Sequence, residues 1–445
     1  AGAIPVLPIA EPEHVLPGPA ELWRAAVVLW NPSSMTRQAL ISHLNALSQD
    51  ATAMAEHHRA LAQLRLLTGA ESFGHPIHAL MAAQCDAQLA QQGLAAPGRI
   101  ANRIRIYHLG PRAARSPLGY SAFERLAGNR IIRAKTPADA DIVLTGWNRD
   151  LAENPELLAQ GFAKNPDLRC MVISEEPLWD TVWSGGYVAR DRPFECAGKL
   201  HSYRYLNHMN SKVFEFEHVP YFLLTAAHFA PRYISMLGRY AQMRPSELLR
   251  RWQQAPVVAA FVAEYRDDPV FDFSDPANGV RGLCRYRTQV AQATRDPQTL
   301  RIGLGWPETE IRRQDLPDWH LDKITRLQGQ VRLCAAYENT HMRSYITEKP
   351  FDAFAIGAMP VCYASPDHRL HELIAPGAMI NTYDQSPETA AAWIGEYTPD
   401  ISNAESWLET AAALRGRFMQ ANALAAERQR ITEEVLREIN VFLNP

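Results

Sequence analysis

A run of polar residues between positions 337 and 349 contains the residue types that bind a phosphate ester. Lys349 supplies a positive charge, and Pro350 after it favours the first turn of a helix, for which Thr347 is a suitable N-cap. Such a helix would direct backbone N–H groups toward an anion. Other hydrogen-bonding groups accompany the lysine in this run: Glu338, Asn339, Tyr345, Thr347 and Glu348. Residue types alone fit either a phosphate site or the solvated start of a helix.

Two adjacent carboxylates, Glu175 and Glu176, follow the strand-like run at 168–173. A carboxylate at the carboxyl end of a strand can take a proton from a hydroxyl group as that hydroxyl attacks a substrate. Adjacent side chains of an extended chain point to opposite sides, so we expect only one of the two to face a substrate. The alternative is that both are surface acids at the end of a strand.

The sequence contains no spacing typical of a metal site. The Asp-x-Asp sequence at Asp139 to Asp141 precedes a strand-like run instead of following one, which favours a turn. His57, His58 and His371 have no second ligand pair at useful spacing. The six cysteines form no C-x-x-C and are expected to be buried free thiols. We therefore expect no metal and no other cofactor.

The segment Y-E-N-T-x4-Y-I-T-E-K at 337–349, followed by a helix, a glycine and a Pro-Val strand, is similar to the FENS…YVTEK motif of the α-1,3-fucosyltransferases, a family of glycosyltransferase family 10 type. The resemblance implies that Asn339, Tyr345, Glu348 and Lys349 contact GDP-fucose, with Lys349 on the diphosphate and Glu348 near sugar or ribose hydroxyls. Tyr337 replaces the usual Phe and Thr340 the usual Ser, so the class of donor is better defined than its sugar.

The same resemblance implies two further contributions. The family places an arginine on the donor phosphates from the start of a helix, and the matching segment at 279–296 offers Arg281, Arg285 and Arg287, of which Arg285 or Arg287 fits best. The family's G-E-x-x-P-like segment aligns best with Glu176 as the catalytic base, while Glu175 stands where a glycine is common.

The elements that must position these residues form two consecutive series of β-rich runs separated by helical segments, a pattern typical of parallel α/β sheets. The first series lies at 103–109, 129–135, 140–147, 168–177 and 201–207, and the second at 256–265, 299–306, 331–339, 358–365 and 378–384. We expect an α/β fold of GT-B type, with two Rossmann-like domains and a cleft between them. The expected domains are an extended arm and helical extension at 1–95, an acceptor-side domain at 96–250, a GDP-sugar-binding domain at 251–400, and C-terminal helices packing back at 401–445.

Composition limits the partners. The formal net charge of the 445 residues is −3, which gives no general attraction to nucleic acid, and no apolar stretch approaches the length of a membrane span. We expect a cytoplasmic protein, at the inner face of the membrane if its acceptor is lipid-linked. Peripheral association through such an acceptor and a homodimer through the helical extension are both compatible with the sequence.

These observations lead to one expected activity. The chain is expected to be an inverting, metal-independent glycosyltransferase that moves L-fucose or a related deoxy-sugar from a GDP donor to a glycan hydroxyl, in bacterial surface-polysaccharide or lipopolysaccharide synthesis. Two alternatives stay open: the same fold with another nucleotide sugar, or a non-catalytic glycan-binding or scaffold protein.

Overall fold

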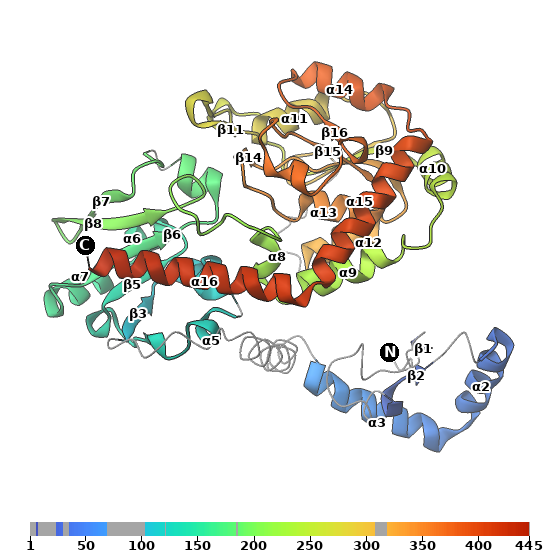
Figure 1. Ribbon diagram of the computed structural model, residues 1–445, viewed down its shortest axis with the longest axis horizontal. Helices are drawn as coiled ribbons and strands as arrows, with labels where there is room; N and C mark the ends of the chain where they lie inside the picture. The colour runs from blue at the N-terminus through green and yellow to red at the C-terminus, as the bar shows by residue number, and fades with distance from the viewer. Residues whose placement is uncertain are drawn as a thin grey trace. The chain divides into compact units, whose positions relative to one another are not determined.

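The chain forms two compact units, Ala1–Arg99 and Ile100–Pro445. The structure is a computed structural model, drawn in Figure 1, that describes residues 6–7, 24–29, 35–68, 103–120, 122–183, 186–307 and 318–444. In the first unit, the parallel strands β1 (Val6–Leu7) and β2 (Val28–Leu29) are followed by the helices α2 (Arg37–Gln49) and α3 (Ala51–Thr68). Both helices lie in the segment expected to be helical. Residues 69–95, and all but Val6 and Leu7 of the proline-rich first 20, lie outside the described residues.

The second unit begins with an α/β lobe, here named the N-terminal lobe, that is built on a six-stranded sheet. In spatial order its strands are β4 (Ile131–Arg133), β3 (Ile104–His108), β5 (Ile142–Thr145), β6 (Arg169–Ile173), β8 (Lys199–Leu206) and β7 (Asp191–Cys196). Its helices include α5 (Phe123–Ala127), α6 (Arg149–Glu153) and α7 (Pro155–Lys164). All neighbouring strands are parallel except β7 and β8. β7 was not predicted, because its exposed residues interrupt any apolar run.

The following C-terminal lobe is built on a five-stranded, fully parallel sheet. In spatial order its strands are β12 (Thr299–Ile302), β9 (Val257–Val262), β13 (Val331–Ala335), β15 (Met359–Cys362) and β16 (Ile380–Asn381). Its helices include α10 (Pro245–Gln254), α11 (Cys284–Ala293), α12 (Trp319–Leu327), α13 (Lys349–Ile356) and α14 (Pro387–Glu396). The chain runs from β9 to β12 on one side and then crosses to β13 on the other. The carboxyl ends of β9 and β13 therefore form a topological switch point, where open α/β sheets bind ligands.

Short elements and long helices connect the two lobes. The connection between them contains α8 (Phe222–Thr225) and α9 (Phe229–Gly238), and a small antiparallel sheet contains β10 (Ser274–Asp275), β11 (Val280–Gly282) and β14 (Thr340–His341). After α15 (Ile401–Met419), the long helix α16 (Ala421–Leu443) runs along the N-terminal lobe, as Figure 1 shows. There Glu433 forms an ion pair with Arg130 at 2.7 Å, and the buried carboxylate of Glu427 accepts from the backbone N–H groups of Glu217 and His218.

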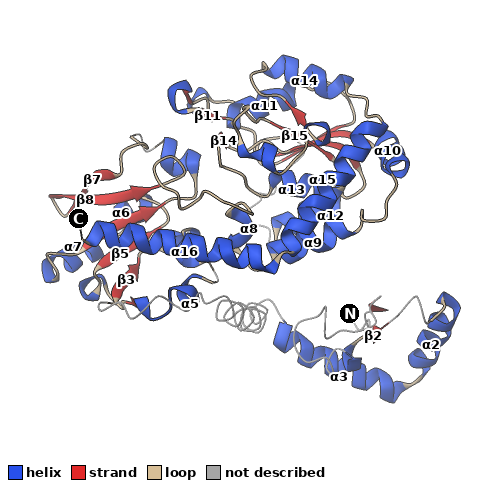
Figure 2. Cartoon of the chain, viewed as in Figure 1, coloured by secondary structure: helices blue, strands red, loops and turns tan. Residues whose placement is uncertain are grey.

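Two Rossmann-like lobes in one unit confirm the predicted GT-B class, and Figure 2 shows helices around both sheets. The five cysteines within the described residues are free and buried, as predicted; Cys85 lies outside them. Among the helices that the structure describes, none combines the length and the apolar character needed to cross a bilayer.

Candidate active site

The helix α13 begins at Lys349, directly after the loop that follows β13. Pro350 lies in its first turn, as predicted, and Gly357 ends the helix at a φ of 83°, where a side chain would be strained and a Cβ would lie 2.7 Å from the Tyr240 hydroxyl. The prediction of Thr347 as N-cap is wrong. The N-cap position belongs to Glu348, in helical conformation and with no side-chain cap bond. Thr347 instead forms two hydrogen bonds to Glu338 Oε1. Its hydroxyl donates at 2.8 Å and its backbone N–H donates at 2.7 Å.

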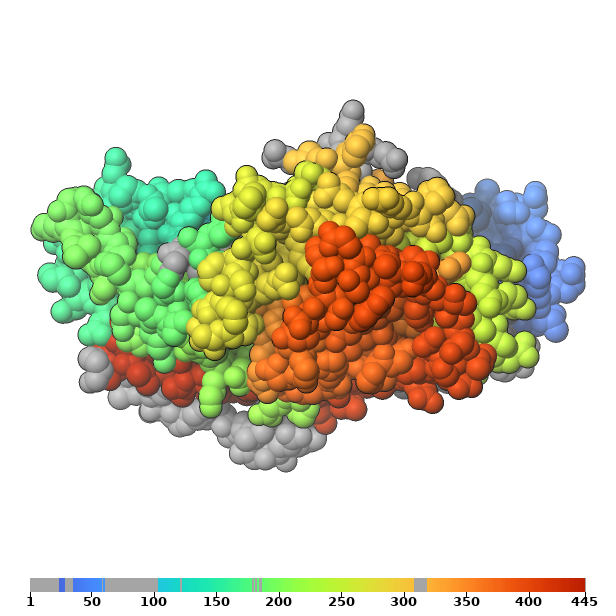
Figure 3. Space-filling view, turned by 90° about the horizontal axis from the view of Figure 1, so that it is seen from above, coloured from blue at the N-terminus to red at the C-terminus, as the bar shows by residue number. Residues whose placement is uncertain are grey.

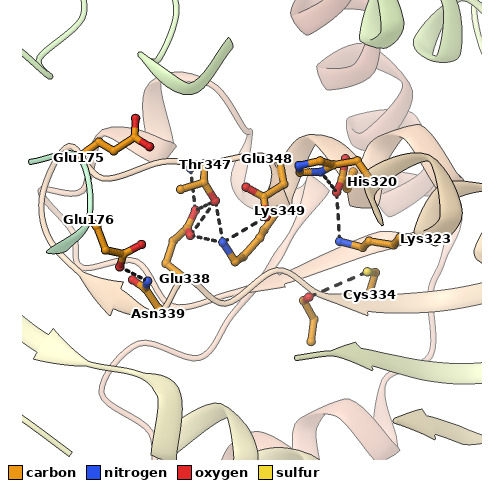
Figure 4. A network of polar contacts seen from close by, with 12 residues as sticks. Glu175, Glu176, His320, Lys323, Cys334, Glu338, Asn339, Thr347, Glu348 and Lys349 are labelled. Carbon is orange, nitrogen blue, oxygen red and sulfur yellow. Dashed lines mark hydrogen bonds and ion pairs between the residues drawn. The ribbon is translucent and has the colours of Figure 1, made fainter. Parts of the chain in front are cut away.

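The ammonium group of Lys349 lies between two carboxylates, as Figure 4 shows. Its Nζ is 2.8 Å from Glu338 Oε2, 3.3 Å from Glu348 Oε1 and 2.7 Å from the Thr347 hydroxyl. Burial raises the pKa of Glu338, while the charge of Lys349 acts in the opposite direction. The positive charge is therefore already shared by two acids, so a phosphate would have to compete with them for it.

Lys349 lines a pocket, named the strand-end pocket, at the carboxyl ends of β9 and β13. Its walls also include Arg287 from α11, Lys323 and Trp319 from α12, and Trp306 after β12. The buried Nε of Arg287 has no hydrogen-bond partner among the described residues. The cations and this guanidinium donor suit an anionic group, and the two indole rings suit a ring of the same ligand. The pocket also lies at a topological switch point, where such folds bind ligands.

The three candidate arginines occupy different places. Arg287 faces the strand-end pocket. Arg285, two residues before it, turns away: its Nε donates to the carbonyl of Asp267 at 3.0 Å, and its Nη1 lies 3.4 Å from Asp272. Arg281 donates to the Tyr363 hydroxyl at 2.6 Å, in a second pocket. The geometry thus favours Arg287 over Arg285 for contact with a bound phosphate.

A buried polar cluster joins α13 to the helices α9 and α12. Asp352, fully buried on that helix, accepts from the Tyr233 hydroxyl at 2.7 Å and from Lys323 Nζ at 3.3 Å, and His320 Nδ1 lies 3.5 Å away. Burial acts to lower the pKa of Lys323, but the attraction of Asp352, together with Cys334 and Glu348, outweighs burial and the pKa is raised. Helices α9 and α12 therefore fix the helix from which Lys349 extends.

Glu175 and Glu176 follow β6 and point to different partners, as expected for adjacent residues. Glu176 accepts from Asn339 Nδ2 at 2.6 Å, a contact between the lobes, whereas Glu175 accepts from the Tyr120 hydroxyl at 3.0 Å. Arg115 lies 3.4 Å from Glu175 and 3.3 Å from Glu176. Burial raises the pKa of Glu175 to about 7, although Arg115 and Tyr120 both act to lower it.

An aromatic cluster contacts the backbone of the acid pair, Glu175 and Glu176. The ring of Tyr345 is buried 5.0 Å from the ring of His208 and 6.5 Å from that of Tyr221. His208 Nε2 is 3.1 Å from the carbonyl oxygen of Glu175, and burial lowers the pKa of this imidazole to about 4. A neutral His208 therefore donates from Nε2 and supports the backbone of the acid pair.

The structure thus brings Glu175, Glu176, Asn339 and Tyr345 together, and groups Glu338, Thr347, Glu348 and Lys349 beside Arg287. Sequence reasoning missed Arg115, Tyr120, His208 and Lys323. One signal for Arg115 existed, since it follows the predicted strand at 103–109 and so lies at the same edge of the sheet as the acids. The other three belong to no motif.

Three of the side chains considered as metal ligands, those of Asp139, Asp141 and His371, have other partners. Asp139 accepts from Thr136 at 2.7 Å, and Asp141 forms an ion pair with Arg105 at 2.6 Å, which confirms a turn before β5. His371 Nε2 lies 3.0 Å from the carbonyl of Ser365. Among the described residues, His, Cys, Asp and Glu form no group of three suited to a metal ion.

The two-lobed α/β fold has a cationic strand-end pocket in one lobe, and Glu176 of the other lobe accepts from Asn339 in the loop before α13. This arrangement is the one expected of a glycosyltransferase. Residues 315–409 match the family model "Glycosyltransferase family 10 (fucosyltransferase) C-term". This span includes α12, the loop at 337–348 and α13. The chain is therefore a glycosyltransferase, and its segment 315–409 is similar to family 10, as the motif at 337–349 predicted.

Three solved structures resemble the chain, each at 14% identity. A crystal structure of α1,3-fucosyltransferase with GDP-fucose has a TM-score of 0.36, with 73% of this chain and 87% of the other covered. One with GDP has a TM-score of 0.35 and the same coverage, and a third, described as α1,3-fucosyltransferase, has 0.37, with 69% and 81% covered. No curated protein sequence matches the chain.

Proposed function

We propose that the protein is an inverting glycosyltransferase that moves L-fucose or a related deoxy-sugar from a GDP donor to a glycan hydroxyl. One observation carries the proposal: Glu176 of the N-terminal lobe accepts from Asn339 of the C-terminal lobe at 2.6 Å. This contact joins the proposed base to the segment that resembles a donor site. The acid and the donor would then lie within reach of one another across the interlobe boundary.

In this proposal the nucleotide occupies the strand-end pocket. Arg287 and Lys349 contact the diphosphate, and Asn339, Tyr345, Thr347, Glu338 and Glu348 surround the sugar and ribose. As the bond from the anomeric carbon to the diphosphate lengthens, the leaving group gains negative charge that preorganised cations stabilise. Lys349 can supply this only by exchanging part of its contact with Glu338 and Glu348 for the diphosphate. No metal is required by this scheme.

The transfer itself needs a proton acceptor. The acceptor oxygen forms a bond to the anomeric carbon, the bond to the diphosphate breaks with its electron pair leaving on GDP, and the hydroxyl proton passes to a carboxylate. Glu176, beside Asn339, is the proposed base. Glu175 is the alternative, because a carboxylate with a pKa of about 7 is a suitable base near neutral pH.

The test compares Glu176→Gln with Glu175→Gln in donor-dependent transfer and in GDP binding. The variant of the base loses transfer by about 100-fold or more while GDP affinity stays within about twofold of wild type. Donor hydrolysis is measured with GDP-, UDP- and CMP-sugars. Preference for a UDP- or CMP-sugar would overturn the donor assignment, and absence of any donor-dependent reaction would identify a glycan-binding or scaffold protein instead.

The cellular setting is part of the same proposal. A GDP-dependent enzyme of this kind fits surface-polysaccharide or lipopolysaccharide synthesis in the bacterial cytoplasm. A lipid-linked acceptor would bring the protein to the inner face of the membrane, and α2 and α3 offer a surface for a homodimer. Flotation with acceptor-bearing vesicles and sedimentation of the full chain test these two contacts.

A further inference from the structure

A second pocket, named the interlobe pocket, lies between the two lobes and is separate in its lining residues from the strand-end pocket. His208 contributes from the N-terminal lobe, and Arg281, Tyr363 and Tyr383 contribute from the C-terminal lobe, the two tyrosines at the carboxyl ends of β15 and β16. Figure 3 shows the green surface of the first lobe meeting the yellow and orange surface of the second. None of the proposed donor-binding residues lines this pocket.

One wall of the interlobe pocket is a fixed aromatic surface. The Asn381 side chain accepts from the backbone N–H groups of Ala364 at 3.0 Å and Tyr383 at 3.1 Å, and donates to the Ala364 carbonyl at 2.7 Å. The rings of Tyr363 and Tyr383 meet at 5.2 Å, and Tyr383 keeps 36% of its surface exposed. Tyr383 is thus held in place and partly exposed, and an aromatic ring of this kind can stack against the apolar face of a sugar ring.

The charges around this wall argue against an anionic ligand. Two guanidinium groups, Arg281 and Arg343, face three carboxylates, Glu215, Asp367 and Asp384. Both ring nitrogens of His341 are bonded, Nδ1 to the Gly279 carbonyl at 3.0 Å and Nε2 to the Ser365 N–H at 3.2 Å, so this ring is neutral. His208 is neutral as well. Mixed donors and acceptors with a slight negative excess favour an uncharged ligand rich in hydroxyl groups over a phosphate or an acidic sugar.

The interlobe pocket also adjoins the acid pair. His208 lines it and contacts the Glu175 carbonyl at 3.1 Å, and the ring of Tyr345 lies 5.0 Å from the His208 ring. We infer that the interlobe pocket binds an uncharged sugar residue of the acceptor glycan, stacked on Tyr383, and so directs the acceptor toward Glu175 and Glu176. This inference rests on the proposed glycosyltransferase function and adds the class and the position of the acceptor.

The experiment measures binding of three sugar probes to the full chain with GDP present, by saturation-transfer NMR. Lactose and N-acetylglucosamine are the uncharged probes, and glucuronic acid is the acidic one. Tyr383→Ala is expected to weaken binding of the uncharged probes by about tenfold. Tyr383→Phe, which keeps the ring, retains the affinity. Trp393→Ala removes a similarly exposed aromatic from α14 and serves as the matched control.

Three results would overturn the inference: no binding of either uncharged probe to wild type, equal affinity in wild type and Tyr383→Ala, or tighter binding of glucuronic acid. Thermal unfolding at an unchanged midpoint shows that Tyr383→Ala is folded. GDP affinity, measured on the same samples, distinguishes failure of the pocket assignment from failure of the proposed function. If GDP binds but sugar affinity does not depend on Tyr383, only the pocket assignment is wrong. If no nucleotide binds, the proposed function is wrong.

Discussion

Asn339 and Glu176 are joined by a hydrogen bond of 2.6 Å between the two lobes. The backbone carbonyl of Asn339 also accepts from the N–H group of Leu283 at 2.8 Å, and Leu283 is the N-cap residue of α11. Arg287, one turn later on that helix, faces the strand-end pocket. A single asparagine therefore links the proposed base with the helix that carries the arginine best placed for phosphate.

Asn339→Ala tests this link. A hydrogen bond to a charged group contributes about 1.5–3 kcal/mol, so loss of the amide should lower kcat by about 10- to 100-fold. The donor KM should change much less, because the variant affects the base more than the diphosphate contacts. Steady-state kinetics separate the two constants. The control is Asn154→Ala, which removes a hydrogen bond from the Asn154 side-chain amide to the Asp150 carbonyl at 2.8 Å. A rise in the donor KM alone in Asn339→Ala would instead assign Asn339 to donor binding.

Glu175 should make stability depend on pH. Its pKa is raised from 4.5 to about 7 by burial, so between these values the folded state keeps a proton that the unfolded chain has lost. The contribution to stability is complete below pH 4.5 and is lost as the pH rises toward 7. Relative to Glu175→Gln, the free energy of unfolding of wild type should fall by about 2–3 kcal/mol between pH 4.5 and 8.

Urea denaturation across this pH range measures the difference. Glu405→Gln, on the exposed side of α15, should follow wild type at every pH. If the free energy of unfolding depends on pH in the same way in Glu175→Gln and wild type, Glu175 titrates normally in the folded protein. Its role as an alternative base then loses support.

Lys349 combines a structural and a proposed binding role, and two variants can separate them. Lys349→Met leaves Glu338 and Glu348 buried without their cation and should cost about 3–5 kcal/mol of stability. Adding Glu338→Gln removes one of those charges and should recover part of the loss. GDP affinity, measured by calorimetry, should stay low in both variants. Recovery of GDP binding along with stability would show that Lys349 acts only through the fold.

Arg287 and Arg285 form a matched pair on one helix. Arg287→Ala should weaken GDP binding by about 10- to 100-fold, because a charge-assisted bond to phosphate is lost from the strand-end pocket. Arg285→Ala should change GDP affinity by less than about twofold, since Arg285 is engaged with Asp267 and Asp272. Titration calorimetry with GDP at constant salt decides between them, and the opposite ranking would return the phosphate role to Arg285.

Local signals in the sequence were sufficient for most strands of the two large sheets and for α13. Pro350 and Gly357 mark the two ends of that helix, and continuous apolar runs identify β5, β6, β13 and β15, because these features depend on residues near one another in the chain. The motif at 337–349 also predicted the family whose model matches residues 315–409. The edge strand β7 was not predicted, because a half-exposed strand has no continuous apolar run.

Tertiary structure alone decided which side chains meet. Arg115 contacts residues about 60 positions later in the chain, and Asn339 reaches Glu176 across 163 positions, so no local pattern encodes either contact. The choice of Arg287 over Arg285 depends on how α11 is rotated, and the sharing of Lys349 between two acids depends on how the loop at 337–348 folds back. The sequence by itself therefore determined the class of enzyme, a glycosyltransferase, and predicted the segments that would carry its chemistry. Long-range packing determined the partners of each charge, because electrostatic contacts depend on distance in space and not on separation in sequence.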